Sequence, residues 1–199
     1  MDKSSRFDLD KAVDSVDLEG SSADRPWELL DLMQNRAFSR RAGLRKRDLP
    51  RFFWRLVARE WSGFDVIPHE AYMKAFAKFR CAWEPECMTL YALRRYKSED
   101  DPDNLAIYNG LPDRLTVYRG QDKSEPPGLS WTIDRKTAGN FARGHRGIYN
   151  RNPVILKTTI VKSGIAFVTF DREESEVILF EPPDMKQCKA STQGIPPRR

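Results

Sequence analysis

The first half of the chain carries apolar residues at the three- and four-residue spacing of amphipathic helices. The clearest case begins near Asp48, where Pro50 suits a first helical turn and large apolar residues recur up to Trp61. The same spacing predicts helices that begin at Asp24, cover residues 69–83 and run through residues 88–93. We therefore expect a helical region over residues 25–97.

The pattern changes after the acidic loop of residues 98–104, because short runs rich in β-branched and aromatic residues take over. One short helix, over residues 134–142, interrupts them. Helices followed by strands are the order expected of an α+β protein. The sequence thus predicts a helical N-terminal half followed by a compact strand-rich domain at 105–181. The expected strands cover residues 115–118, 154–161, 165–170 and 177–180.

Both ends of the chain lack this patterning. Residues 1–24 combine acids and serines with few large apolar groups, and such a composition does not offset the entropy lost on ordering. Residues 182–199 contain four prolines and scattered lysines. We expect a flexible acidic arm at 1–24 and a flexible tail at 182–199.

Composition narrows the class of protein. The apolar fraction of 40% supports a packed core, and no apolar run approaches the roughly 20 residues that cross a bilayer. The N-terminus lacks a secretory signal, so a cytoplasmic location is expected, or the host cytosol for a phage or secreted effector. Three cysteines without a C-x-x-C pair and only two histidines argue against a metal site. We expect no metal and no membrane partner.

Positive charge is concentrated in one part of the chain. Residues 36–59 carry nine cations against the single acid Asp48, within a chain whose formal net charge is +5. Four of the arginines are spaced by four residues and so form one stripe along the predicted helix. The stripe is either the solvated side of that helix or a docking face for an acidic protein or a nucleic acid. Its members are Arg47, Arg51, Arg55 and Arg59.

Three short segments of the second half carry the residue types of one enzyme family. They are Tyr118-Arg119-Gly120, the run Gly128-Leu129-Ser130-Trp131-Thr132, and Glu174-Ser175-Glu176. In this order, each at or near a strand end, they resemble the Arg, Ser, Glu-x-Glu pattern of the ADP-ribosyltransferase superfamily. They are most similar to its bacterial and phage members with Tyr-Arg-Gly and Gly-Leu-Ser-Trp-Thr signatures. The resemblance covers residues 115–181, about a third of the chain, and implies a split β-sheet that binds NAD.

The resemblance also assigns roles to single residues. Glu176 is implied to be the catalytic carboxylate, Glu174 to orient and deprotonate the acceptor, and Ser130 to position the glutamate or the nicotinamide ribose. If residues 174–176 are extended, both glutamates point to one face. Arg119 suits the phosphates or ribose of NAD, because its planar guanidinium makes paired hydrogen bonds. Gly120 is expected to allow a close approach.

Further contacts with NAD are expected around these residues. Trp131 and Thr132 adjoin Ser130 in the same segment, and Phe141 and Phe170 are candidates to stack on nicotinamide. Thr132 or Asp134 also suits an N-cap for the predicted helix. A glycine-flanked loop adds three candidate phosphate ligands, Arg143, His145 and Arg146.

The chemistry suits these residue types. Cleavage of the nicotinamide bond develops positive charge on the ribose, and a carboxylate held there stabilises the transition state more than the ground state. We expect a mono-ADP-ribosyltransferase that uses NAD as co-substrate and modifies a macromolecule, with an arginine acceptor favoured by Glu174. Two alternatives stay open: a non-catalytic inhibitor or binding module that uses its basic helices, and an NAD glycohydrolase. A serine hydrolase and a nucleotide kinase are not expected, because the sequence contains neither a G-x-S-x-G elbow nor a Walker loop.

Overall fold

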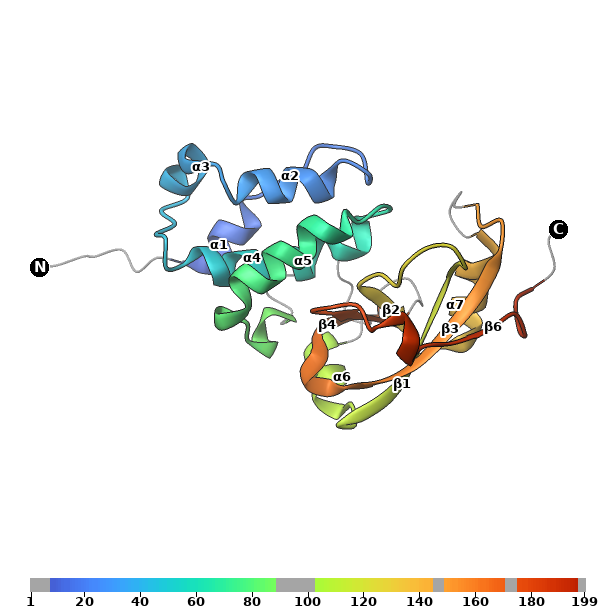
Figure 1. Ribbon diagram of the computed structural model, residues 1–199. Coiled ribbons are helices and arrows are strands. Elements are labelled where there is room, and N and C mark those ends of the chain that lie inside the picture. The colour runs from blue at the N-terminus through green and yellow to red at the C-terminus, as the bar shows by residue number, and fades with distance from the viewer. Residues whose placement is uncertain (1–7, 89–102, 145–148, 171–174, 197–199) are drawn as a thin grey trace, which may run out of the picture. The chain divides into compact units, whose positions relative to one another are not determined.

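The computed structural model describes residues 8–88, 103–144, 149–170 and 175–196 (Figure 1). The chain divides into two compact units, residues 1–101 and residues 102–199. Among the described residues the first unit is helical, whereas the second combines a six-stranded sheet with two α-helices. The predicted α+β class, with helices first and strands later, is confirmed.

The helical unit follows the predicted apolar spacing. The helices that begin at Asp24 and Asp48 are present, and each has a proline in its first turn. The predicted helix over 69–83 ends at Phe79 and continues as a short 3₁₀ turn, 80–82. The fourth predicted helix falls mostly outside the described residues. The α-helices are α1 (Leu9–Asp14), α2 (Arg25–Leu32), α3 (Arg36–Arg41), α4 (Leu49–Glu60) and α5 (His69–Phe79).

Aromatic side chains of α4 and α5 form the core of this unit. Phe52 and Phe53 are fully buried, as the amphipathic pattern predicts. Phe53 meets Phe76 edge to face, with ring centroids 6.1 Å apart. The buried indole of Trp54 donates a hydrogen bond of 2.8 Å to the carbonyl of Phe79, so its polar group is satisfied. The predicted apolar face of α4 is therefore a core face.

The predicted flexible arm at 1–24 is wrong for residues 8–24. Val13 and Val16 are 1% and 3% exposed, and α1 packs on α4. The buried Arg59 donates to the carbonyls of Val13, at 2.7 Å, and Val16, at 3.1 Å. Its guanidinium also pairs with Glu60 at 2.5 Å. The segment has few apolar residues, but its backbone is also held by the buried side chain of Arg59.

The second unit contains one antiparallel sheet of order β4-β5-β2-β1-β3-β6. The four predicted strands are present, and the first is longer than expected, because it continues through Arg119 to Asp122. The strands are β1 (Arg114–Asp122), β2 (Ser130–Thr132), β3 (Pro153–Val161), β4 (Ile165–Thr169), β5 (Glu176–Leu179) and β6 (Lys189–Ser191). The helices are α6 (Asn104–Gly110) and α7 (Arg135–Gly144).

The predicted flexible tail at 182–199 is wrong where the structure describes it. Strand β6 pairs with β3, and Arg135 donates a hydrogen bond of 2.7 Å to the carbonyl of Gln193. The tail lacks apolar alternation because its strand lies at the sheet edge and its residues are mostly exposed. Its order comes from backbone pairing, which apolar spacing does not reveal.

Helix α7 confirms the predicted helix and one of its two predicted caps. Asp134 accepts hydrogen bonds of 3.0 Å from the backbone N–H groups of Lys136 and Thr137. The helix packs closely on β1 at Gly120, where a Cβ atom would overlap the carbonyl oxygen of Ala138. The absence of a side chain at Gly120 is thus needed for this packing. Among the described residues, no helix is long and apolar enough to cross a membrane.

We expect Arg59→Met to lower the free energy of unfolding of the helical unit by about 3 kcal/mol, because Glu60 and two carbonyls lose a buried partner. Arg51→Met is the control, since Arg51 pairs with Glu84 at the surface and its loss costs about 1 kcal/mol or less. Urea unfolding followed by circular dichroism at the helix band measures both. Equal effects would contradict the role of Arg59.

We expect Gly120→Ala to destabilise the second unit by about 3 kcal/mol or more, because the added methyl group meets the backbone of α7. Gly110→Ala is the matched control. A Cβ atom there meets nothing within 4 Å, so its effect stays within about 0.5 kcal/mol. Hydrogen exchange of the β1 and β3 amides reports the loss. Unchanged protection in Gly120→Ala would show that α7 does not depend on this contact.

Candidate active site

Three predicted functional residues lie on three neighbouring strands. Arg119 is in β1, Ser130 begins β2 and Glu176 begins β5, and the sheet order places β2 between the other two. Residues far apart in the sequence are thereby brought to one region of the sheet.

Ser130 connects the other two residues. Its hydroxyl donates a short hydrogen bond to Oε1 of Glu176, and its carbonyl accepts one of 2.7 Å from Nη1 of Arg119. The strand register explains the first contact. Ser130 pairs with Ile178 and Thr132 pairs with Glu176, so Ser130 and Glu176 are diagonal neighbours on one face. One residue therefore fixes a carboxylate through its side chain and a guanidinium through its backbone.

The side chain of Arg119 reaches Ser130 next to the point where β1 pairs with β2. In the register of these two strands Tyr118 is paired with Thr132. Beyond this residue pair, the guanidinium of Arg119 donates its hydrogen bond to the carbonyl of Ser130. Burial lowers the pKa of Arg119, and the negative charges of Glu125 and Glu176 oppose this shift. The guanidinium stays a cation at neutral pH, because an arginine begins from a very high pKa.

Gln121 is a site residue that the sequence analysis missed. Its Oε1 accepts a hydrogen bond of 2.8 Å from Nε of Arg119. Its Nε2 donates to the carbonyls of Glu125, at 2.5 Å, and Asp122, at 3.3 Å, which fixes the orientation of the amide. The side chain is buried. Its position two residues beyond Arg119 in an extended strand is the signal that was available.

The loop after β1 is held by Asp122. Its carboxylate accepts hydrogen bonds from the backbone N–H groups of Asn152, at 2.8 Å, and Ser124, at 2.9 Å, and from the Ser124 hydroxyl, at 2.7 Å. These bonds stabilise the ionised form, so the pKa of Asp122 falls to about 2. The loop presents the Glu125 carbonyl to Gln121. Gln121 thus positions Arg119, the Glu125 carbonyl positions Gln121, and the Asp122 carboxylate holds the loop that carries this carbonyl.

Other predicted NAD contacts have structural partners. Trp131 is buried and its indole N–H donates to the carbonyl of Gly128 at 3.0 Å. Thr132 is also buried, and its hydroxyl oxygen accepts from the backbone N–H of Asp134 at 3.0 Å. Gly120 faces helix α7. The fold alone accounts for these three residue types, and their contacts with NAD stay predictions.

The predicted aromatic residues differ in position. Phe170 follows Thr169, which pairs with Glu176, and its backbone N–H donates to Asn104 at 3.2 Å. It is half-buried beside the strand end that carries Glu176. Phe141 is half-buried on α7. Of the two candidates, Phe170 is the one whose backbone lies next to the start of β5.

Glu174 lies outside the described residues, as do His145 and Arg146. Ser175, which follows Glu174, has a φ of 46°, in the left-handed region that L-residues seldom adopt. The expectation of an extended segment through Ser175 is therefore wrong, and so is the alternation argument that placed both glutamates on one face. Arg143 is half-buried at the end of α7.

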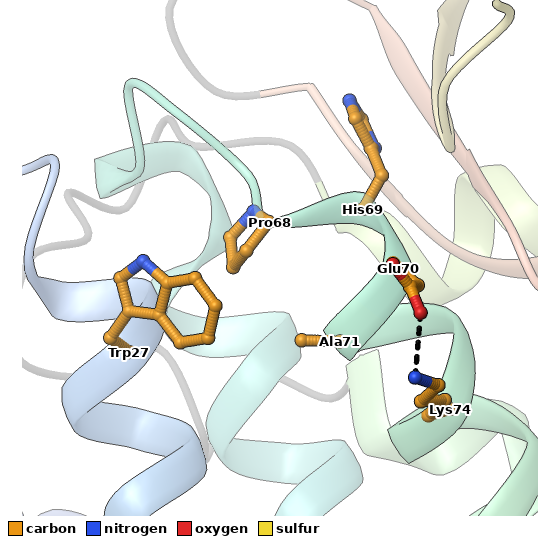
Figure 2. Close-up of a pocket in the computed structure, with 6 residues that line it drawn as sticks. All are labelled: Trp27, Pro68, His69, Glu70, Ala71 and Lys74. Atoms are coloured by element: carbon orange, nitrogen blue, oxygen red, sulfur yellow. Dashed lines mark hydrogen bonds and ion pairs between the residues drawn. The ribbon is translucent and has the colours of Figure 1, made fainter.

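The helical unit contains an open depression of about 420 Å³ between α2 and α5 (Figure 2). Trp27, 53% exposed, stands at one side opposite Pro68, and Glu70 pairs with Lys74 at 2.6 Å along another. The ion pair also lowers the pKa of Glu70. The lining of the depression also includes His69 and Ala71, and it contains none of Arg119, Ser130 and Glu176.

We expect Gln121→Met to loosen Arg119, because the Nε–H group loses its acceptor while the side-chain volume is kept. Loss of one buried hydrogen bond, worth about 1 kcal/mol, makes solvent exchange of this N–H about fivefold to tenfold faster. Nuclear magnetic resonance of the arginine Nε–H groups measures this exchange. The Nε–H of Arg45, bound to Asp48 elsewhere, is the internal control. An unchanged rate at Arg119 would show that Gln121 does not position it.

The arrangement of Arg119, Ser130 and Glu176 on adjacent strands is the feature that bears on function. Comparisons of the chain with models of protein families, with curated proteins and with solved structures find no match.

Proposed function

We propose that the protein is a mono-ADP-ribosyltransferase, which cleaves NAD and transfers ADP-ribose to a macromolecule in the cytosol. The observation that carries this proposal is the double role of Ser130, bonded to both Glu176 and Arg119. The three residues have the types and chain order of the family pattern. Their hydrogen bonds support a common site, which short sequence motifs alone do not.

In the proposed reaction the bond between C1′ of the ribose and the nicotinamide nitrogen breaks, and its electron pair leaves with nicotinamide. Positive charge develops on the ribose, and the carboxylate of Glu176 stabilises it. A lone pair of the acceptor then forms the new bond to C1′, and the acceptor loses a proton. The products are nicotinamide, a proton and the modified acceptor.

Ser130 and Arg119 have distinct tasks in this proposal. The hydroxyl of Ser130 holds one oxygen of Glu176 and so limits the orientations of the carboxylate. Arg119 uses Nε and Nη1 for Gln121 and Ser130, and its guanidinium has further N–H groups on Nη2. A group of fixed orientation with donors to spare suits the phosphates or ribose of NAD. Gln121 is a positioning residue for this contact.

An arginine side chain is the proposed acceptor. This choice depends on Glu174, the glutamate that the family resemblance assigns to the acceptor. Glu174 itself lies outside the described residues. In this proposal Glu176 acts at the ribose and Glu174 at the acceptor.

We expect Glu176→Gln to reduce the release of nicotinamide by about 100-fold or more, because a neutral amide stabilises the developing charge poorly. Glu181→Gln is the matched control: Glu181 is exposed beyond the end of β5, and the same charge is removed. The assay incubates each protein with NAD labelled in its adenylate part and a bacterial lysate. It measures free nicotinamide and labelled macromolecules separately.

The two readouts distinguish the outcomes. Release of nicotinamide together with labelled protein supports the transfer of ADP-ribose. Loss of that label in hydroxylamine, under conditions selective for arginine linkage, supports the arginine acceptor as well. Free ADP-ribose without labelled macromolecules would replace transfer by NAD hydrolysis at the same site. Equal activity of Glu176→Gln and Glu181→Gln would refute the role of Glu176.

A further inference from the structure

A second functional feature lies in the helical unit, between the start of α3 and the start of α4 (Figure 1). Residues 36–48 contain six cations and one acid, so their charge of +5 equals the formal net charge of the whole chain. The rest of the sequence is balanced. All six cations are exposed. We define the α3 basic surface as Arg36, Arg40, Arg41, Arg45, Lys46 and Arg47.

This surface differs from the arginine stripe predicted from spacing. Arg59 is buried against α1, and Arg55 pairs with Asp10, so neither faces solvent as a free cation. Arg51 pairs with Glu84 at 2.5 Å. Of the predicted stripe only Arg47 belongs to the α3 basic surface. The exposed charge therefore precedes α4 and does not run along it.

Local stability explains only part of this charge. Arg40 and Arg41 occupy the last turn of α3, where cations interact favourably with the helix dipole. Arg36 occupies the first position, where the dipole disfavours a cation, and it repels Arg40 one turn later. Asp48 is the single acid, and Arg45 at 3.2 Å and Arg47 at 3.9 Å share it. An external polyanion would relieve the remaining repulsion.

The neutral residues of the segment indicate which polyanion fits. Phe38 packs on Phe52, with ring centroids 5.7 Å apart, and Leu44 is buried. The surface thus offers cations without the apolar centre that is typical of protein interfaces. Interfaces with nucleic acids are instead polar and strongly positive. Five of the six cations are arginines, whose planar groups bind phosphate oxygens in pairs.

The neutral polar side chains in and next to this segment are engaged within the helix. Oδ1 of Asn35 accepts from the backbone N–H groups of Ala37, at 3.0 Å, and Phe38, at 2.9 Å. The hydroxyl of Ser39 donates to the carbonyl of Asn35 at 3.1 Å. The side chain of Asn35 thus caps the helix, that of Ser39 bonds to the preceding turn, and the ring of Phe38 is engaged within the unit. We propose that the α3 basic surface binds the phosphate backbone of a nucleic acid.

Fluorescence anisotropy with the full chain tests this proposal. The probes are a labelled DNA duplex of about 20 base pairs and a single-stranded RNA of similar length, each at about 50 to 300 mM salt. The test variant carries Arg36→Gln, Arg40→Gln, Arg41→Gln and Lys46→Gln. The control carries Lys123→Gln, Lys136→Gln, Lys186→Gln and Lys189→Gln, which are exposed and remove the same charge from the second unit. Circular dichroism verifies that both fold.

We expect wild type to bind at least one probe with a strong dependence on salt. The test variant should bind about tenfold or more weakly. For the duplex, the slope of log affinity against log salt should become less steep by about three to four, which is about 0.9 for each lost phosphate contact. The control should keep the wild-type slope. Equal losses in both variants would reduce the effect to net charge, and an absence of binding to both probes would overturn the proposal.

Two further measurements complete the test. A poly-glutamate peptide of similar length that competes as well as the nucleic acid would replace the proposal by an acidic protein partner. Glu176→Gln should bind the probes like wild type, because its carboxylate belongs to the second unit. Failure of nucleic-acid binding and failure of the proposed transferase activity are therefore seen in different assays.

Discussion

The short strand β2 is the constraint on which the candidate site depends. Its three residues lie between β1 and β5, and each has a separate task. Ser130 connects Arg119 to Glu176, Trp131 fills the core, and Thr132 accepts a hydrogen bond at the start of α7. A change of register by one residue would exchange the faces of Ser130 and Trp131. A buried tryptophan therefore also fixes the side of the sheet on which Ser130 meets Glu176.

Much of the fold followed from local patterns. The amphipathic spacing around Phe52 and Phe53 predicted α4, and four apolar runs predicted four of the six strands. Strands β2 and β6 were not predicted, because each has only three residues and little alternation of apolar and polar residues. Their stability comes from pairing with β5 and β3, which are distant in sequence. Local spacing contains no information about such partners.

The arginines show the same limit in another form. A spacing of four residues placed Arg55 and Arg59 on one stripe with Arg47, and the sequence gives no sign that their environments differ. Their partners, Asp10 and the carbonyls of Val13 and Val16, come from a segment more than 40 residues earlier. Taken alone, the acidic segment predicts a flexible arm, and the arginines predict either a solvated side of the helix or a docking face. In the structure the acidic segment binds two of the arginines, Arg55 and Arg59. These contacts hold the segment against α4 and remove two cations from the exposed surface.

For the candidate site, the proposed reacting residues were easier to predict than the residues that position them. Arg119, Ser130 and Glu176 were singled out because their segments resemble the Arg, Ser, Glu-x-Glu pattern of one enzyme family, whose reaction suits a cation, a hydroxyl and a carboxylate. Gln121 was missed because a neutral amide has no chemistry of its own in that reaction, and its importance lies in two hydrogen-bonded neighbours. A charged group that must point in one direction needs such a neutral partner, since a carboxylate in its place would neutralise the guanidinium. The choice of glutamine therefore keeps the positive charge of Arg119 available for an anionic ligand.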